Sequence, residues 1–119
     1  KKEEKKNKEW IVSPLREVPQ ELPALTRAVK VLKKIDKNYE KGSSYEQDVE
    51  ALLEAVEALK TCSHEPYSRE LEKIMGDILM RLSDIARIAK IAQEQVLVDR
   101  IEDLIDKYEK DESNMGLQG

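Results

Sequence analysis

The chain has 119 residues, one cysteine, no phenylalanine and four glycines, and 39% of its residues are charged. This length fits one domain with a core of three or four helices, and the composition, rich in lysine and glutamate, is typical of a helical protein. The formal net charge of −4 argues against a nucleic-acid partner, because proteins that bind nucleic acids present a basic surface.

Cys62 is the single cysteine, so an internal disulfide is excluded and a reducing compartment, hence a cytoplasmic location, is expected. No apolar run reaches the ~20 residues of a membrane span, and no signal-peptide pattern is present, so no membrane partner is expected. Cys62 lies near His64 in a polar connector without a second cysteine or histidine. We interpret this pair as part of an ordinary loop rather than a catalytic or zinc site.

Residues 1–18 are expected to form a linker and an N-terminal arm. Nearly all of the first nine residues are charged, and apolar side chains then occur among three prolines. We expect this arm to pack on the core of its own chain, with a partner surface as the alternative. Its apolar residues are Trp10, Ile11, Val12 and Leu15.

Two helices are predicted in the first half of the chain. The first begins near Leu22 and Pro23 and ends before Gly42, because its apolar residues recur with a spacing near 3.6. The second follows Ser44, because Ser44-x-x-Gln47 is a capping-box signature. Its expected apolar stripe consists of Val49, Leu52, Leu53, Val56 and Leu59.

Two more helices are predicted in the second half. Pro66 is expected to open the third and longest helix, since proline suits a first turn. The break after it is placed near residues 96–98, where Asp99 with Glu102 makes a plausible cap for a fourth helix.

No segment has the alternating pattern of a strand, so the predicted fold class is all-α. The helical domain is expected over residues 19–110, followed by a disordered tail over residues 111–119.

Two five-residue segments stand out within the second and third helices. They are Glu50-Ala51-Leu52-Leu53-Glu54 and Lys73-Ile74-Met75-Gly76-Asp77. Because a helix returns a side chain to nearly the same face after three or four residues, two helices with acids at i and i+3 can direct four carboxylates at one magnesium cluster. Here the positions paired with Glu54 and Asp77 are Ala51 and Ile74. The spacing therefore predicts the place of a metal site, but with half of its ligands missing.

At these segments the sequence resembles the MazG-like nucleoside triphosphate pyrophosphohydrolases. The run from Glu50 to Leu59 is similar to the family's Glu-Glu-x-x-Glu helix, and the run from Ile74 to Leu79 to the end of its Glu-Glu-x-x-Asp motif. Residues 19–28 resemble the entry to the second domain of tandem members, where Leu-Pro-Ala-Leu precedes a lysine-rich helix. The resemblance covers about residues 19–110 and implies a four-helix MazG-like bundle completed by dimerisation.

The resemblance also implies which positions hold magnesium in the family. In this chain those positions are Ala51, Glu54, Ile74 and Asp77, so Glu54 and Asp77 are the implied metal ligands and the other two cannot bind a cation. Three more acids could supply oxygens if the helices rotate slightly: Glu50, Glu57 and Asp84.

Near the end of the domain, Ile105-Asp106-Lys107-Tyr108 is similar to the family's Asn/Asp-Lys element. This resemblance implies that Asp106 and Lys107 contact a nucleotide. Two features depart from the family: Lys73 replaces the leading acid of the second motif, and the Gly-Phe-Asp-Trp stretch after the first helix is absent.

The family reaction is metal-assisted hydrolysis of a nucleoside triphosphate to the monophosphate and pyrophosphate. The resemblance implies a homodimer. The loss of two ligands predicts weak or lost catalysis, with Mg²⁺ needed only if the protein is active, and a scaffolding or regulatory role. An intact enzyme with a rearranged metal site is a second interpretation. The alternative from another class is a helical protein-interaction module without nucleotide chemistry. In the first case Glu54 and Asp77 line a shared groove, and in the last they point to unrelated solvent.

Overall fold

The computed structural model describes the backbone of residues 13–118 and the side chains of residues 13–111. A short 3-10 helix, η2 (Pro14–Glu17), precedes four α-helices, and the described part of the chain contains no strand. The all-α prediction is therefore confirmed, while the expected packing of Trp10, Ile11 and Val12 lies outside the described residues. The helices are α1 (Ala24–Tyr39), α2 (Tyr45–Thr61), α3 (Arg69–Ala89) and α4 (Gln93–Gln118).

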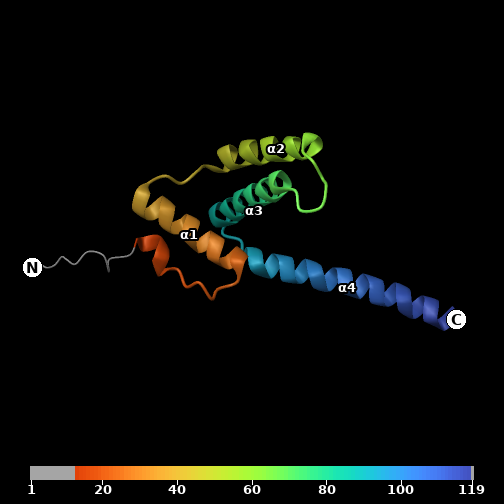
Figure 1. The fold of residues 1–119 in the computed structure, drawn as a ribbon. Helices are drawn as coiled ribbons and strands as arrows, with labels where there is room; N and C mark the ends of the chain where they lie inside the picture. The colour runs from red at the N-terminus through yellow and green to blue at the C-terminus, as the bar shows by residue number, and fades with distance from the viewer. Residues whose placement is uncertain (1–12, 119) are drawn as a thin grey trace, which may run out of the picture.

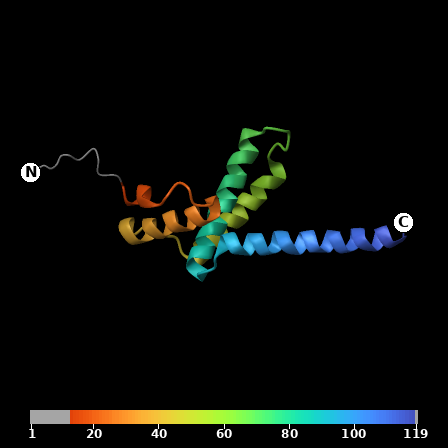
Figure 2. The ribbon, with the colours of Figure 1, turned by 90° about the horizontal axis from the view of Figure 1, so that it is seen from below.

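Helices α2 and α3 lie side by side as an antiparallel hairpin, and α1 packs across α3 (Figures 1 and 2). Helix α4 leaves this three-helix body near the start of α1 and projects away from it in both views. The resulting shape is elongated, with extents of 78 × 33 × 30 Å. None of the helices in the described part of the chain is both long and apolar enough to cross a membrane.

The N-terminal segment packs on its own chain from Ser13 onward. Val18 is buried, η2 lies against α1, and Lys34 of α1 forms an ion pair with Glu17 at 3.1 Å. Helix α1 ends where Glu40 adopts the left-handed conformation with a φ of 53°, which terminates the helix before Gly42 as the sequence predicted.

The capping box predicted for α2 is present. The Ser44 hydroxyl accepts a hydrogen bond from the Gln47 backbone at 3.1 Å, and the Ser44 N–H donates to Oε1 of Gln47 at 2.9 Å. Helix α3, by contrast, begins at Arg69 rather than at Pro66. Ser68 is its N-cap and accepts from the Leu71 N–H at 3.1 Å, because Tyr67, with a φ of 66°, first turns the chain.

The break between the third and fourth helices lies at Lys90, not near Asp99 as predicted. Lys90 adopts the left-handed conformation with a φ of 59°, and the backbone N–H of this residue caps the end of α3. The buried Ser83 hydroxyl lies 2.8 Å from Oε1 of Gln93 and holds the start of α4 against α3. Asp99 sits inside α4, where it accepts a hydrogen bond from Gln95 at 2.8 Å. Local sequence misses this break because lysine rarely takes a positive φ.

Helix α4 continues to Gln118, through the segment that the sequence predicted as a tail beginning at residue 111. Residues 99–115 contain no glycine or proline, so nothing local ends the helix at Lys110.

Few apolar side chains are buried within one chain. In the described part these are Val18, Cys62 and Ala86, so much of the apolar surface of α2, α3 and α4 stays accessible. Part of the apolar stripe predicted for α2 faces solvent, because the small side chains of Ala51 and Ala55 face α3 and the cavity between the helices. The exposed large apolar residues of α2 and of the described part of α4 are Tyr45, Leu53, Val56, Leu59, Val96, Leu97, Val98, Ile101, Leu104, Ile105 and Tyr108.

Candidate functional site

A cavity of about 620 Å³ lies between α2, α3 and the connection that follows α1. The four positions that the resemblance assigns to magnesium binding all line this one cavity. The two acidic segments, about twenty residues apart in sequence, are thus brought together by the antiparallel α2–α3 hairpin. These four lining residues are Ala51, Glu54, Ile74 and Asp77.

The side chains at these positions do not make a magnesium cluster. Ala51 and Ile74 offer no donor atom, and Oδ2 of Asp77 lies 3.3 Å from Nζ of Lys73, in an exposed i,i+4 ion pair. Among the described residues, no three His, Cys, Asp or Glu side chains are grouped so that they could hold a metal ion. The residues present therefore do not fit the four-carboxylate site of the resemblance, because magnesium requires several oxygen ligands in near-octahedral geometry.

Of the three acids considered as further ligands, only Asp84 lines the cavity. Its carboxylate is already bound by Arg87, whose Nε lies 2.6 Å from Oδ1. Glu57 points to an ion pair with Lys60 at 3.6 Å, and Glu50 is exposed on α2 outside the cavity.

Asp106 and Lys107 lie within α4, the helix that projects from the three-helix body (Figure 1), and both are exposed. Neither residue lines the cavity of its own chain, and Nζ of Lys107 lies 5.7 Å from the centre of the Tyr108 ring. Within one chain, the structure therefore does not bring these residues to Glu54 and Asp77.

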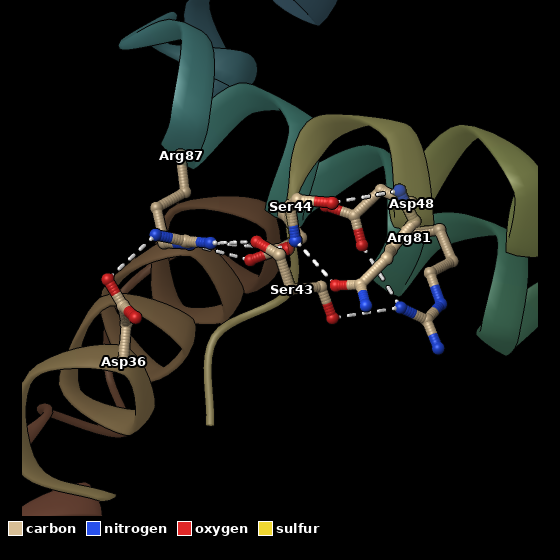
Figure 3. Close-up of polar contacts among 8 residues, drawn as sticks. Asp36, Ser43, Ser44, Asp48, Arg81 and Arg87 are labelled. Atoms are coloured by element: carbon tan, nitrogen blue, oxygen red, sulfur yellow. Dashed lines mark hydrogen bonds and ion pairs between the residues drawn. The ribbon is translucent and has the colours of Figure 1, made fainter. Parts of the chain in front are cut away.

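A polar network that the sequence did not predict lies beside the cavity (Figure 3). Asp48 is completely buried, and its Oδ1 accepts a hydrogen bond from Nη1 of Arg81 at 3.0 Å. Nη1 also lies 3.4 Å from the Ser43 hydroxyl. In the sequence Asp48 resembles an ordinary acid in the first turn of a helix. The signal that could have identified it is its place on the small-residue face of α2, three residues before Ala51.

Arg87 joins this network to α1 (Figure 3). Its guanidinium donates to both oxygens of Asp84, to the Ser43 carbonyl at 3.0 Å and to Oδ2 of Asp36 at 3.3 Å. One side chain thus connects α1, the α1–α2 connection and α3. This arginine is only 11% exposed, so its bonds act in a poorly solvated environment and fix the wall of the cavity.

The two buried carboxyl groups have different proton affinities. Burial raises the pKa of Asp48 to about 6, the neighbouring Asp84 adds to this rise, and Arg81 opposes it. Burial also acts to raise the pKa of Asp84, but the hydrogen bonds and the positive charge of Arg87 outweigh it and hold that pKa below the ordinary value. Oδ2 of Asp48 has no hydrogen-bond partner among the described residues. Below pH 6 the pair therefore holds one proton, which resides on Asp48 next to an ionised Asp84, and above pH 6 both carboxyl groups are ionised.

Replacing Asp48 with asparagine is expected to flatten the pH dependence of stability. The pKa of Asp48 is higher in the folded chain, at about 6, than its ordinary value of 3.8. The contribution of Asp48 to the free energy of unfolding is therefore fully present below pH 3.8 and is lost as the pH rises through 6. Between pH 5 and 8 the wild-type free energy of unfolding should fall by about 1.4 kcal/mol from this group. Asp48→Asn should lack that fall, because the asparagine amide does not titrate, while its oxygen can still accept the hydrogen bond from Arg81.

Urea denaturation followed by helical circular dichroism at the two pH values measures this difference. Asp103→Asn, at an exposed site on α4, is the matched control and should follow the wild-type dependence. An equal pH dependence in wild type and Asp48→Asn would show that Asp48 does not hold the proton.

Comparisons with protein-family models, with curated proteins and with solved structures found no match to this chain.

Proposed function

We propose that this chain is a MazG-related protein of the nucleoside triphosphate pyrophosphohydrolase fold, with weak or lost catalysis and a scaffolding or regulatory role. The observation that carries this proposal is that Ala51, Glu54, Ile74 and Asp77 line one cavity. An interaction module whose acids point to unrelated solvent would not place Glu54 and Asp77 around the same cavity, as they are here. Because the four positions lie around one cavity, the structure supports assigning the family's metal-binding positions to these residues.

Weak or lost catalysis follows from the side chains at those positions. Hydrolysis of a triphosphate needs positive charge next to the phosphate oxygens as well as an activated water. Two carboxylates, one of them paired with Lys73, would hold a divalent cation loosely. Each ~1.4 kcal/mol of lost transition-state stabilisation costs a factor of ten in rate.

A homodimer is part of the proposal. The projecting α4 exposes Leu97, Ile101, Leu104 and Tyr108 at spacings of three and four residues, and α2 exposes Leu53 and Val56. Apolar faces of this extent are covered in stable proteins, and a second copy would supply matching surfaces to complete a bundle.

The test is magnesium-dependent release of pyrophosphate from a panel of ribo- and deoxynucleoside triphosphates. We expect little or no turnover from a folded dimer. Analytical ultracentrifugation should give this dimer a mass of twice 13.7 kDa. Glu54→Ala and Asp77→Ala serve as matched variants. Substantial turnover that both substitutions abolish would contradict the loss of catalysis and establish a rearranged active site.

The alternative function is a helical protein-interaction module without nucleotide chemistry. The exposed apolar face of α4 is the observation that favours it. This alternative predicts that neither nucleotides nor pyrophosphate bind at the cavity, and that the chain remains a monomer until a different protein covers α4.

A further inference from the structure

Charges of opposite sign are separated along the cavity. Lys41 and Arg81 line it where the connection after α1 meets α3, whereas Asp77 lies one turn of α3 further on, with Glu54 across the hairpin. Asp84, the other acid of the lining, is neutralised by Arg87 at 2.6 Å. The end of the cavity that holds Lys41 and Arg81, here called the cationic end, has one cation, Lys41, that is unpaired in the described part of the chain, whereas Arg81 is paired with the buried Asp48.

Arg81 uses only part of its hydrogen-bonding capacity. Both of its bonds, to Asp48 and to Ser43, involve Nη1, so the N–H groups on Nε and Nη2 have no partner among residues 13–111. The side chain is 41% exposed although its counter-ion is completely buried. The bonds to Asp48 and Ser43 hold the guanidinium in place (Figure 3), and its free edge presents the paired donors that bind an oxyanion with two parallel hydrogen bonds.

Lys41 supplies a second charge at the same end. It forms no ion pair with any described residue, it is exposed, and it lines the cavity next to Gly42. Leu32 and Ile35 of α1 form an apolar wall nearby. A guanidinium edge, a flexible ammonium group and an apolar wall suit a small molecule that carries a phosphate on a less polar body.

We propose that Arg81 and Lys41 form a subsite that binds the phosphate group of a small phosphorylated molecule directly, without a divalent cation. This inference rests on the proposed function in one respect, namely that the cavity is a binding site for phosphorylated ligands. It goes beyond that function because the protein's own cations take the place of the metal that the acidic end does not hold. Phosphate is favoured over carboxylate because its several oxygens can accept from the free edge of Arg81 and from the ammonium group of Lys41 at the same time.

The experiment measures binding by calorimetry in the presence of EDTA. The probes are inorganic phosphate, inorganic pyrophosphate and adenosine 5′-monophosphate, with adenosine as the phosphate-free control. Saturable binding of a phosphate-bearing probe is expected, with no binding of adenosine. Lys41→Ala should weaken binding about fivefold to tenfold, and Arg81→Lys, which keeps the charge beside Asp48 but loses the planar edge, by about tenfold or more. Lys37→Ala, on the exposed surface of α1 outside the cavity, should bind as the wild type does.

The possible contrary results separate this inference from the proposed function. Absence of saturable binding in EDTA by folded protein, or equal binding by wild type and Lys41→Ala, would overturn the subsite. Binding that appears only with Mg²⁺ and disappears in Asp77→Asn would also overturn it, while leaving the proposed fold and function in place. If circular dichroism shows that Arg81→Lys does not fold, the binding measured for Lys41→Ala decides whether the subsite exists. Pyrophosphate release is measured in a separate assay, so the presence or absence of turnover does not change the conclusion from metal-free binding.

Discussion

Replacing Arg87 with alanine is expected to lower the free energy of unfolding by about 3–5 kcal/mol, the cost typical of removing one partner from a buried ion pair. Arg87 neutralises the buried Asp84 and also bonds to Asp36 and to the Ser43 carbonyl. Without it, an ionised Asp84 would remain beside Asp48 in a poorly solvated environment, and α1 would lose its polar link to α3. The loss of stability is large because the variant keeps the negative charge of Asp84 in a poorly solvated place without a partner. This uncompensated charge destabilises the fold more than the loss of the hydrogen bonds themselves.

Chemical denaturation with urea measures this effect. Arg100→Ala is the matched control, because Arg100 is exposed on α4 and forms one ion pair, with Asp103 at 3.2 Å. Its removal should cost less than about 1 kcal/mol. Arg87→Lys should fall between the two, since a single ammonium group cannot reach all three partners. A loss for Arg87→Ala no larger than that for Arg100→Ala would show that the network does not stabilise the fold.

The double substitution Ala51→Glu with Ile74→Glu is expected to create magnesium affinity that the wild type lacks. Both residues line the cavity together with Glu54 and Asp77. Four carboxylates directed into one cavity repel one another, so the double variant should be less stable than wild type without metal and should regain stability when Mg²⁺ binds. At a magnesium concentration ten times Kd, binding raises the free energy of unfolding by about 1.4 kcal/mol.

Thermal denaturation with and without Mg²⁺ measures this gain, which corresponds to a rise in Tm of several degrees. Ala51→Gln with Ile74→Gln is the matched control, because glutamine has the same size without the charge, and its Tm should not respond to Mg²⁺. If the glutamate pair gains no magnesium affinity, the assignment of these positions as former ligand positions is wrong. Measuring pyrophosphate release by the same double variant then shows whether the added carboxylates also restore turnover.

The two ends of the cavity differ in how firmly their side chains are held. At the acidic end, Asp77 is 59% exposed and is paired only with Lys73, a type of contact that contributes little. At the other end, Arg81 is held by a buried aspartate and a serine hydroxyl. A fixed donor loses less entropy when it binds a ligand. This difference is why we place binding at the cationic end and expect little chemistry at the acidic end.

Much of the candidate site could be predicted from the sequence, because it depends on helix periodicity. Residues three apart share a face of a helix, so Ala51 with Glu54, and Ile74 with Asp77, had to lie together wherever their helices packed. That the two pairs meet at one cavity required α2 and α3 to form a hairpin, which the short connection between them favoured. The cationic end could not be predicted, since it joins Lys41 to Arg81 across forty residues of sequence.

The sequence by itself determined those features that depend on contacts within about four residues. These include the helical class, the capping box at Ser44, the end of α1 before Gly42 and the register of the two acidic segments. The physical reason is that backbone hydrogen bonds, caps and side-chain periodicity are all short-range along the chain.

The tertiary structure alone decided where α3 ends, which face of α2 is buried and which charges are paired. The break at Lys90 requires a lysine in a conformation that local preferences disfavour, and it is accompanied by the contact between Ser83 and Gln93. The buried Asp48 likewise pairs with Arg81, thirty-three residues away. Such features arise from long-range packing, in which the energy of a few buried polar contacts exceeds the small local preferences that a sequence pattern reveals.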